Sequence, residues 1–338
     1  MKPVLPLSGI LLAALLTGCS ASEGASCSSS AMFRPAAVAP GAVFPDSLSV
    51  SPGGDAVAAG CWQGLCRWDT ADGTYEVAFE GNPIALATDW SLVATGGGCG
   101  DIALVDLDSG KRVRTLTGLP YEDDVTDMSW IQDAAISPDG KLVAGTGTDD
   151  TLMVWTIDGE EVVDAKVEGA GALAFSPDGA QLAVTSDAGV EILDTDNGES
   201  TGQVTGAEGL PAWSPNGRWL AGPGTGGAPT VWSVEDLEVV ETLPTTDATG
   251  FSFSGSSVGF AADNAAAVWS PKALGGDGEP RTLAGLVDSG RTVEGPVMTA
   301  FGPDGATLYA ATGDTGITAW DLSGDEPGTR FTLPPTSS

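Results

Sequence analysis

The side chains of this chain that could perform chemistry are mainly carboxylates and cysteines. Its 338 residues include 46 acidic and 13 basic side chains, five cysteines and no histidine, which gives a formal net charge of −33 at pH 7. Without an imidazole, the chain cannot form a Ser-His-Asp triad, a Cys-His nucleophile pair or a His-ligated zinc or haem site. Two facing carboxylates could still hydrolyse a glycosidic bond, and grouped carboxylates could hold a cation.

The same charge argues against nucleic acid as a ligand. Binding to a duplex depends on Lys and Arg side chains that neutralise phosphates, and here the few cations are scattered in a strongly negative field. A hydrophobic fraction of 42% with only 17% charged residues is too apolar for a disordered chain. We therefore expect a folded protein with a large core that does not bind nucleic acid.

The N-terminal segment has the pattern of an export signal. Lys2 precedes an apolar run at residues 10–16 that is too short to span a bilayer permanently. The run ends in Leu16-Thr17-Gly18-Cys19, which resembles the lipobox of bacterial lipoproteins. The resemblance implies that residues 1–18 are removed, that Cys19 is acylated, and that the exported protein contacts the outer face of a bacterial membrane only through this anchor. Residues 19–40 then form a flexible linker rich in Ser, Ala, Gly and Pro.

Four further cysteines are candidates for disulfide bonds in an oxidising compartment, namely Cys27, Cys61, Cys66 and Cys99. Three pairings are possible. A two-residue turn at Gln63-Gly64 would set Cys61 and Cys66 opposite each other across two strands, and Cys27 would then join Cys99. An all-cysteine metal site is disfavoured because no Cys-x-x-Cys pair occurs.

A turn-forming tetrapeptide recurs along the chain and predicts the elements that position these side chains. Five copies are Ser51-Pro52-Gly53-Gly54, Ser137-Pro138-Asp139-Gly140, Ser176-Pro177-Asp178-Gly179, Ser214-Pro215-Asn216-Gly217 and Gly302-Pro303-Asp304-Gly305. Two degenerate copies are Ala87-Thr88-Asp89-Trp90 and Ser254-Gly255-Ser256-Ser257. Pro presets φ at the second position and Gly favours the end of the turn, so each copy predicts a tight connection between two strands.

A second anchor follows each turn. Its central residues are Trp68, Val105, Trp155, Leu193, Trp232, Trp269 and Trp320, at intervals of 37, 50, 38, 39, 37 and 51 residues. A period near 40 with a strand that ends in a Trp-Asp-like pair is typical of a four-stranded propeller blade. Residues 41–334 therefore resemble a seven-bladed WD40-type β-propeller, an all-β fold of four-stranded antiparallel blades, with residues 335–338 as a tail. The Gly-His dipeptide of eukaryotic WD repeats is absent.

The strands of each blade are named a to d in chain order. This order predicts that the a–b and c–d turns share one face of the ring, and that the b–c turns and the d–a connections between blades share the other. We also expect Phe175, Trp213 and Phe253, each just before a turn, to be buried between adjacent blades.

The face of the b–c turns and d–a connections is the predicted binding face. One long interval adds an insertion at residues 118–133, another adds one at residues 271–295, and insertions in repeat proteins often map to the binding face. The candidate residues are Trp62, Tyr121, Glu122, Asp123, Asp124, Trp130, Asp149, Asp150, Asp187, Asp263 and Asp314. The aspartates are also good turn formers, which is the alternative explanation for their positions.

The leading hypothesis is a monomeric, non-enzymatic, membrane-tethered platform that needs no cofactor or metal and binds a protein or peptide with a basic patch. The alternatives are a carboxylate-only enzyme of the glycoside hydrolase or lyase type, and a cation site at Asp149 and Asp150. Acidic side chains that converge in a desolvated pocket would favour the alternatives, whereas acids spread around a solvated rim favour the platform.

Overall fold

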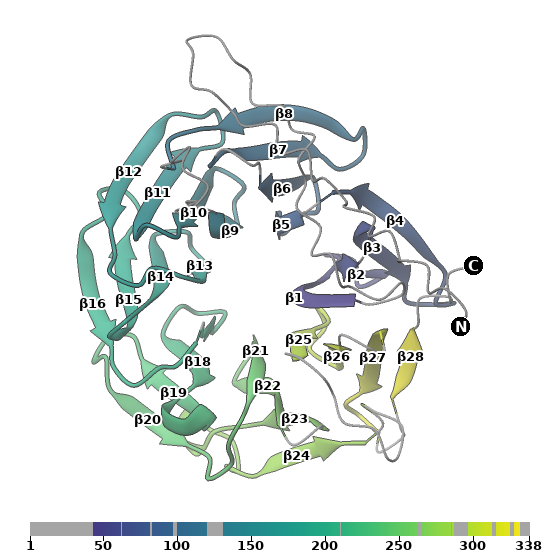
Figure 1. Ribbon diagram of the computed structural model, residues 1–338. Helices are drawn as coiled ribbons and strands as arrows, with labels where there is room; N and C mark the ends of the chain where they lie inside the picture. The colour runs from purple at the N-terminus through teal and green to yellow at the C-terminus, as the bar shows by residue number, and fades with distance from the viewer. Residues whose placement is uncertain are drawn as a thin grey trace, which may run out of the picture.

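The computed structural model arranges the chain as seven four-stranded antiparallel sheets around a common centre, as Figure 1 shows. It describes residues 43–61, 63–81, 83–96, 100–119, 131–209, 211–262, 265–284, 286, 297–312, 316–324 and 328–331. The predicted all-β, seven-bladed β-propeller is confirmed.

Each blade uses four strands that follow one another in the sequence, with strand a nearest the centre (Figure 1). Blades 1 and 2 contain β1 (Val43–Val50), β2 (Ala56–Cys61), β3 (Gly64–Asp69), β4 (Tyr75–Glu80), β5 (Pro83–Leu86), β6 (Leu92–Gly96), β7 (Ile102–Asp106) and β8 (Lys111–Leu116). Blades 3 and 4 contain β9 (Ile131–Ile136), β10 (Leu142–Gly147), β11 (Thr151–Thr156), β12 (Glu161–Lys166), β13 (Leu173–Phe175), β14 (Gln181–Ser186), β15 (Gly189–Asp194) and β16 (Ser200–Val204). Blades 5 to 7 contain β17 (Ala212–Trp213), β18 (Trp219–Pro223), β19 (Pro229–Ser233), β20 (Val239–Thr242), β21 (Thr249–Ser254), β22 (Ser257–Ala262), β23 (Ala265–Trp269), β24 (Pro280–Leu283), β25 (Val297–Phe301), β26 (Thr307–Thr312), β27 (Gly316–Asp321) and β28 (Thr329–Phe331).

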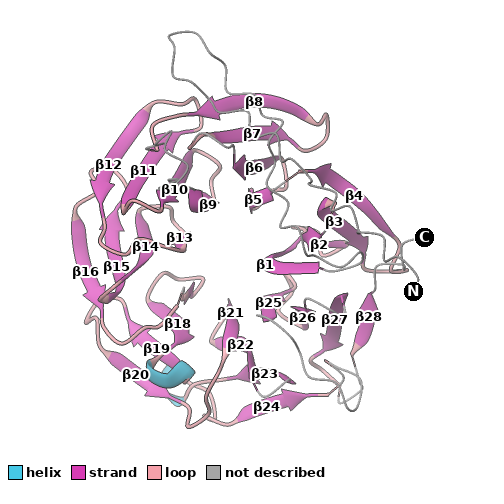
Figure 2. Cartoon of the chain, viewed as in Figure 1, coloured by secondary structure: helices cyan, strands magenta, loops and turns pink. Residues whose placement is uncertain are grey.

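Helical structure is limited, within the described ranges, to two 3-10 turns, η1 (Thr225–Gly227) and η2 (Lys272–Leu274) (Figure 2). No helix in this part of the chain has the length and apolarity needed to cross a membrane.

The tetrapeptide turns form because their side chains satisfy the local backbone. In the β9–β10 turn, the Ser137 carbonyl accepts a hydrogen bond from the Gly140 amide at 2.9 Å, and the Ser137 hydroxyl accepts one from the Leu142 amide at 2.9 Å. The fourth position has a left-handed backbone, with φ of 70° at Gly140. Trp90 occupies this position in the β5–β6 turn with φ of 61°, and its indole donates to the Ser49 hydroxyl of the preceding blade at 3.0 Å.

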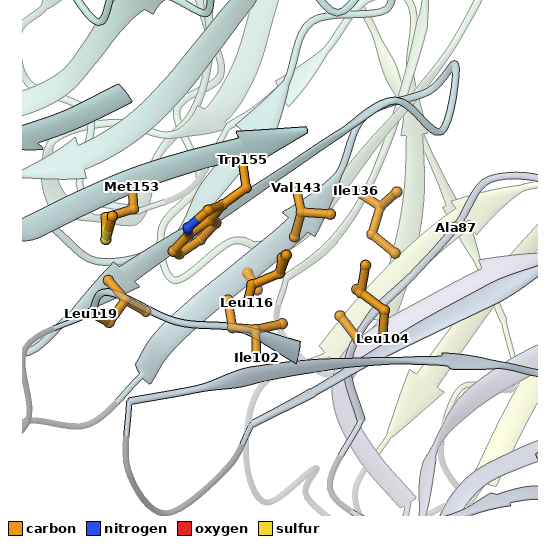
Figure 3. Close-up of a cluster of buried hydrophobic side chains, with 11 residues drawn as sticks. Ala87, Ile102, Leu104, Leu116, Leu119, Ile136, Val143, Met153 and Trp155 are labelled. Carbon is orange, nitrogen blue, oxygen red and sulfur yellow. The ribbon is translucent and has the colours of Figure 1, made fainter. Parts of the chain in front are cut away.

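The apolar core is divided into clusters between neighbouring blades, because each sheet packs face to face against the next. In the cluster between blades 2 and 3, Ile102 and Leu116 face Val143 and Trp155 (Figure 3). The b and c strands are mostly buried, whereas the outer strand β8 is exposed at all but its last residue. All seven predicted c-strand anchors are buried.

The prediction for the a-strand aromatics was correct only in part. Phe175 is buried, but Trp213 and Phe253 are half-buried. Trp213 does lie between blades 4 and 5, and Phe253 lies between blades 5 and 6. The a strands line the centre of the ring (Figure 1), where Trp213 and Phe253 keep part of their surface exposed whereas Phe175 is buried.

The ring closes through side chains rather than through a shared sheet. Blade 7 is completed by its own C-terminal strand, β28, and Val43 begins the a strand of blade 1. Phe331 and Ile317 of blade 7 belong to the same buried cluster as Val57 and Trp68 of blade 1. The sequence left open whether residues 36–43 add a closing strand. Val43 begins β1, and residues 36–42 lie outside the described residues.

A disulfide joins Cys61 and Cys66, with the two Cα atoms 5.7 Å apart, and confirms that pairing. The predicted register of the hairpin was wrong. Cys61 is paired with Gly64 and Cys66 with Ala59, so the two cysteines are not opposite each other but are diagonal neighbours on one face. A two-residue turn must place the residues that flank it opposite each other, and Gly64, with φ of 145°, belongs to β3 rather than to the turn. Cys19, Cys27 and Cys99 lie outside the described residues.

Candidate binding face

The connections between strands separate onto the two faces as predicted. On the first face, the hydroxyl of Thr195 in the c–d turn of blade 4 donates to the carbonyl of Gly179 in the a–b turn at 2.8 Å. On the second face, the amide of Asp187 in the b–c turn of blade 4 donates to the carbonyl of Glu168 in the preceding d–a connection at 3.0 Å. These are called the a–b face and the b–c face below.

Three of the eleven candidate residues lie in the described ranges, and all three are on the b–c face of blades 3 and 4. They are Asp149 and Asp150 in the β10–β11 turn and Asp187 in the β14–β15 turn. The other eight, Trp62, Tyr121, Glu122, Asp123, Asp124, Trp130, Asp263 and Asp314, lie outside the described residues.

Asp149 is held in a local ion pair. Its Oδ2 atom lies 2.8 Å from the Lys166 ammonium and accepts a hydrogen bond from the Thr151 hydroxyl at 2.7 Å. Partial burial alone raises the pKa of Asp149, but the hydrogen bonds from Lys166 and Thr151 and the Lys166 charge outweigh it and hold this pKa below its usual value. Asp149 is therefore ionised at neutral pH, and Lys166 balances its charge.

Asp150 and Asp187 meet on either side of one glycine. Asp150 has a left-handed backbone, with φ of 67°, and its Oδ1 accepts a hydrogen bond from the Gly169 amide at 2.9 Å. A Cβ atom added to Gly169 would lie 2.3 Å from Oδ1 of Asp187, so this second carboxylate also packs against Gly169. Glu168 and Asp187 are both exposed, and together with half-buried Asp150 they gather three carboxylates around this d–a connection.

These acids do not form an enclosed site. Within the described ranges, no three Asp, Glu or Cys side chains are grouped as metal ligands. The turn explanation holds for Asp149, whose carboxylate accepts hydrogen bonds from the Thr151 amide and hydroxyl. The Asp150 carboxylate instead bonds the Gly169 amide of the d–a connection, and Asp187 contributes its backbone amide. Burial raises the pKa of Asp101, in the b–c connection of blade 2, because it outweighs the nearby charge of Arg112.

The sequence reasoning missed a hollow on the opposite, a–b face. It has a volume of about 360 Å³ and lies between blades 5 and 6, beside Asn216, Trp219 and Leu274. The signal was present in the repeats, because blade 5 has Asn216 where four other blades carry Asp, and Trp219 where the other blades carry a smaller side chain. The meeting of these residues with η2 depends on packing between blades and could not be read from the repeats alone.

The family described as WD domain, G-beta repeat matches residues 110–156. The matched segment contains β8, the d strand of blade 2, and continues through β9, β10 and β11 to the end of the c strand of blade 3. The sequence repeat is thus offset by one strand from the structural blade, and it ends on the buried anchor Trp155 followed by Thr156. The match and the seven-bladed ring together support a WD40-like β-propeller.

Proposed function

We propose that this protein is a non-enzymatic interaction platform that is tethered to the outer face of the cell membrane through Cys19. Its b–c face binds a partner protein or peptide that carries a basic patch. WD40 propellers typically bind proteins or peptides and are generally non-enzymatic scaffolds. The ring of stacked sheets supports this role because it presents loops from a rigid core.

The observation that carries the proposal is the group of Asp150, Glu168 and Asp187 around Gly169. Two of these carboxylates are exposed, and within the described residues no ion pair closer than 4.0 Å neutralises either of them. Exposed carboxylates of one sign attract a cationic partner and raise its rate of association. The predicted acidic insertion with Glu122, Asp123 and Asp124 belongs to the same proposed face.

The test compares capture of envelope proteins on the immobilised full chain at low and high salt. In the face variant, Glu168→Gln with Asp187→Asn, we expect association of the captured partner to slow about threefold at low salt, because rim charges act mainly on encounter. The wild-type rate should also fall as salt rises, since exposed charges are screened beyond about 10 Å at 0.1 M ionic strength.

A matched control removes two exposed acids from the a–b face of the same two blades. Glu160→Gln with Glu199→Gln changes the net charge equally, and both residues lie in c–d turns. The proposal requires that this control associates like wild type. Equal effects of the face and control variants would show that only the net charge matters.

A second variant, Glu122→Gln with Asp123→Asn and Asp124→Asn, tests the insertion.

A further inference from the structure

The hollow between blades 5 and 6 is lined without any charged side chain, although the chain carries 46 acidic residues. Asn216 lies in its β17–β18 wall and Ser256 in its β21–β22 wall, Trp219 stands at the start of β18, and Ala273 and Leu274 of η2 cover one side. The hollow lies on the a–b face, so it is separate from the b–c face of the proposed function.

Three departures from the repeat produce this site. The third turn position is Asp in four blades, at Asp89, Asp139, Asp178 and Asp304, but it is Asn216 and Ser256 in the two turns that meet here. The first residue of strand b is Leu142, Gln181 or Thr307 in other blades, but it is Trp219 in blade 5. The tight c–d turn is replaced in blade 6 by the longer connection that contains η2.

The amide of Asn216 is not needed to make the turn. Its Oδ1 accepts hydrogen bonds from the Ser214 hydroxyl at 2.8 Å and the Arg218 amide at 3.0 Å, as Oδ1 of Asp178 does from Ser176 and Ala180. An Asp would therefore serve equally well. The Asn leaves two Nδ2 hydrogens that form no hydrogen bond within the described residues, and the exposed Ser256 hydroxyl on the facing wall forms none there either.

Trp219 supplies a fixed apolar surface between these two donors. It is half-buried against the cluster between blades 5 and 6, as is Leu274. The Arg218 guanidinium lies over the ring, 5.7 Å from its centroid. These contacts hold the indole in place and preorganise it for a ligand.

We propose that this hollow binds a neutral saccharide unit. A sugar ring offers apolar C–H groups to Trp219 and Leu274, and hydroxyls at its edges to Asn216 and Ser256. The volume of about 360 Å³ is at the lower end for small-molecule pockets, which suits one or two sugar rings. The net charge of −33 disfavours an anionic ligand. A proline-rich peptide is also disfavoured, because the grooves that bind such peptides are lined by several aromatic side chains, whereas this hollow is lined by one.

The test titrates neutral tetrasaccharides of glucose and of N-acetylglucosamine into the full chain with 15N-labelled tryptophan. The Trp219 indole resonance is assigned by its loss in Trp219→Phe. We expect at least one saccharide to shift this resonance saturably at millimolar concentration. Asn216→Asp should weaken binding about tenfold, because it removes a donor and adds a charge while keeping the turn sequence of other blades.

Asp178→Asn is the matched control, since it makes the reverse change in the equivalent turn of blade 4, and it should bind like wild type. Ser256→Ala should weaken binding without altering the fold. The proposal is overturned if none of the saccharides shifts the Trp219 resonance, if Asn216→Asp binds as tightly as wild type, or if only a proline-rich peptide produces the shift.

Discussion

The carboxylates of the a–b turns accept hydrogen bonds from their own turns, so part of the acidity of this chain stabilises its fold. Asp139 and Asp178 each accept a hydrogen bond from the serine two residues earlier and from the amide two residues later. On the b–c face, Asp150 bonds Gly169 and Asp149 pairs with Lys166, whereas the carboxylates of Asp187 and Glu168 are exposed. An exposed acid is a better candidate for partner binding than a turn-forming acid, because its charge is not already used within the fold.

Asp139 gives a prediction about pH. Hydrogen bonds from Lys141 and Ser137 lower the pKa of this carboxyl from 3.8 to about 2. Because the folded-state pKa is the lower one, the contribution of Asp139 to stability is present above about pH 4 and is lost as the pH falls toward 2. Urea denaturation should show the free energy of unfolding falling across this range, and less steeply in Asp139→Asn. Identical pH profiles for the two proteins would contradict this role.

At the scale of strands, the c-strand tryptophans differ in a way that can be measured. The Trp155 indole donates to the Thr117 carbonyl of the preceding blade at 3.1 Å. The Trp232 indole nitrogen is buried and has no hydrogen-bond partner within the described residues. Both rings are almost fully buried, so replacing either one with Phe removes a similar apolar area.

Trp155→Phe should therefore lower the free energy of unfolding by about 1 kcal/mol more than Trp232→Phe, because it leaves the Thr117 carbonyl unpaired. Chemical denaturation of the two variants beside wild type provides the measurement. A larger loss in Trp232→Phe would show that packing, and not the hydrogen bond between blades, distinguishes the two positions.

The hairpin of β2 and β3 gives a second prediction at this scale. The Cys61–Cys66 disulfide closes a short loop, and both cysteines are buried in the cluster between blades 7 and 1. Replacing both with Ala should lower the free energy of unfolding by about 2 kcal/mol from loop entropy alone. Because the bond is buried, we also expect a mild reductant to leave it intact until the ring unfolds. Rapid reduction of the native protein, followed by mass spectrometry of alkylated cysteines, would contradict the burial.

The elements that could be predicted from the sequence are those fixed by local chemistry. The Ser-Pro-Asp-Gly turns and the buried c-strand anchors depend on residues within one hairpin, and they predicted the number of blades. Trp213 is half-exposed although the equivalent Phe175 is buried, and this difference depends on how neighbouring blades pack. The pairing of Asp149 with Lys166 and the hollow beside Trp219 arise where strands or blades meet, and a repeat pattern does not contain that information.

For the whole molecule, the closure of the ring does not involve the proposed membrane anchor. Blades 1 and 7 meet through apolar side chains, and the first described residue, Val43, already belongs to blade 1. The proposed anchor at Cys19 thus precedes the ring by 24 residues, 43 − 19 = 24. In this proposal, the linker does not determine which face of the propeller meets a partner, so that face is selected by the surface of the propeller.

The anchor prediction concerns Cys19→Ala. Two or more acyl chains give stable membrane attachment, so loss of the acylated residue should release the protein or leave it as an unprocessed precursor. Metabolic labelling with a fatty acid compares the wild-type and variant proteins. Equal incorporation of label into both would contradict acylation at Cys19.

The central claim is that the b–c face, and not the opposite face, meets a partner. Ala188 and Ala180 are both exposed in blade 4, in its b–c and a–b turns respectively. A photo-cross-linking amino acid at either position leaves every carboxylate in place. On intact cells, we predict that position 188 gives a discrete cross-linked protein whose yield falls in the Glu168→Gln, Asp187→Asn background, and that position 180 does not. Cross-linking of the same protein from position 180, or an unchanged yield from position 188 in that background, would contradict the account.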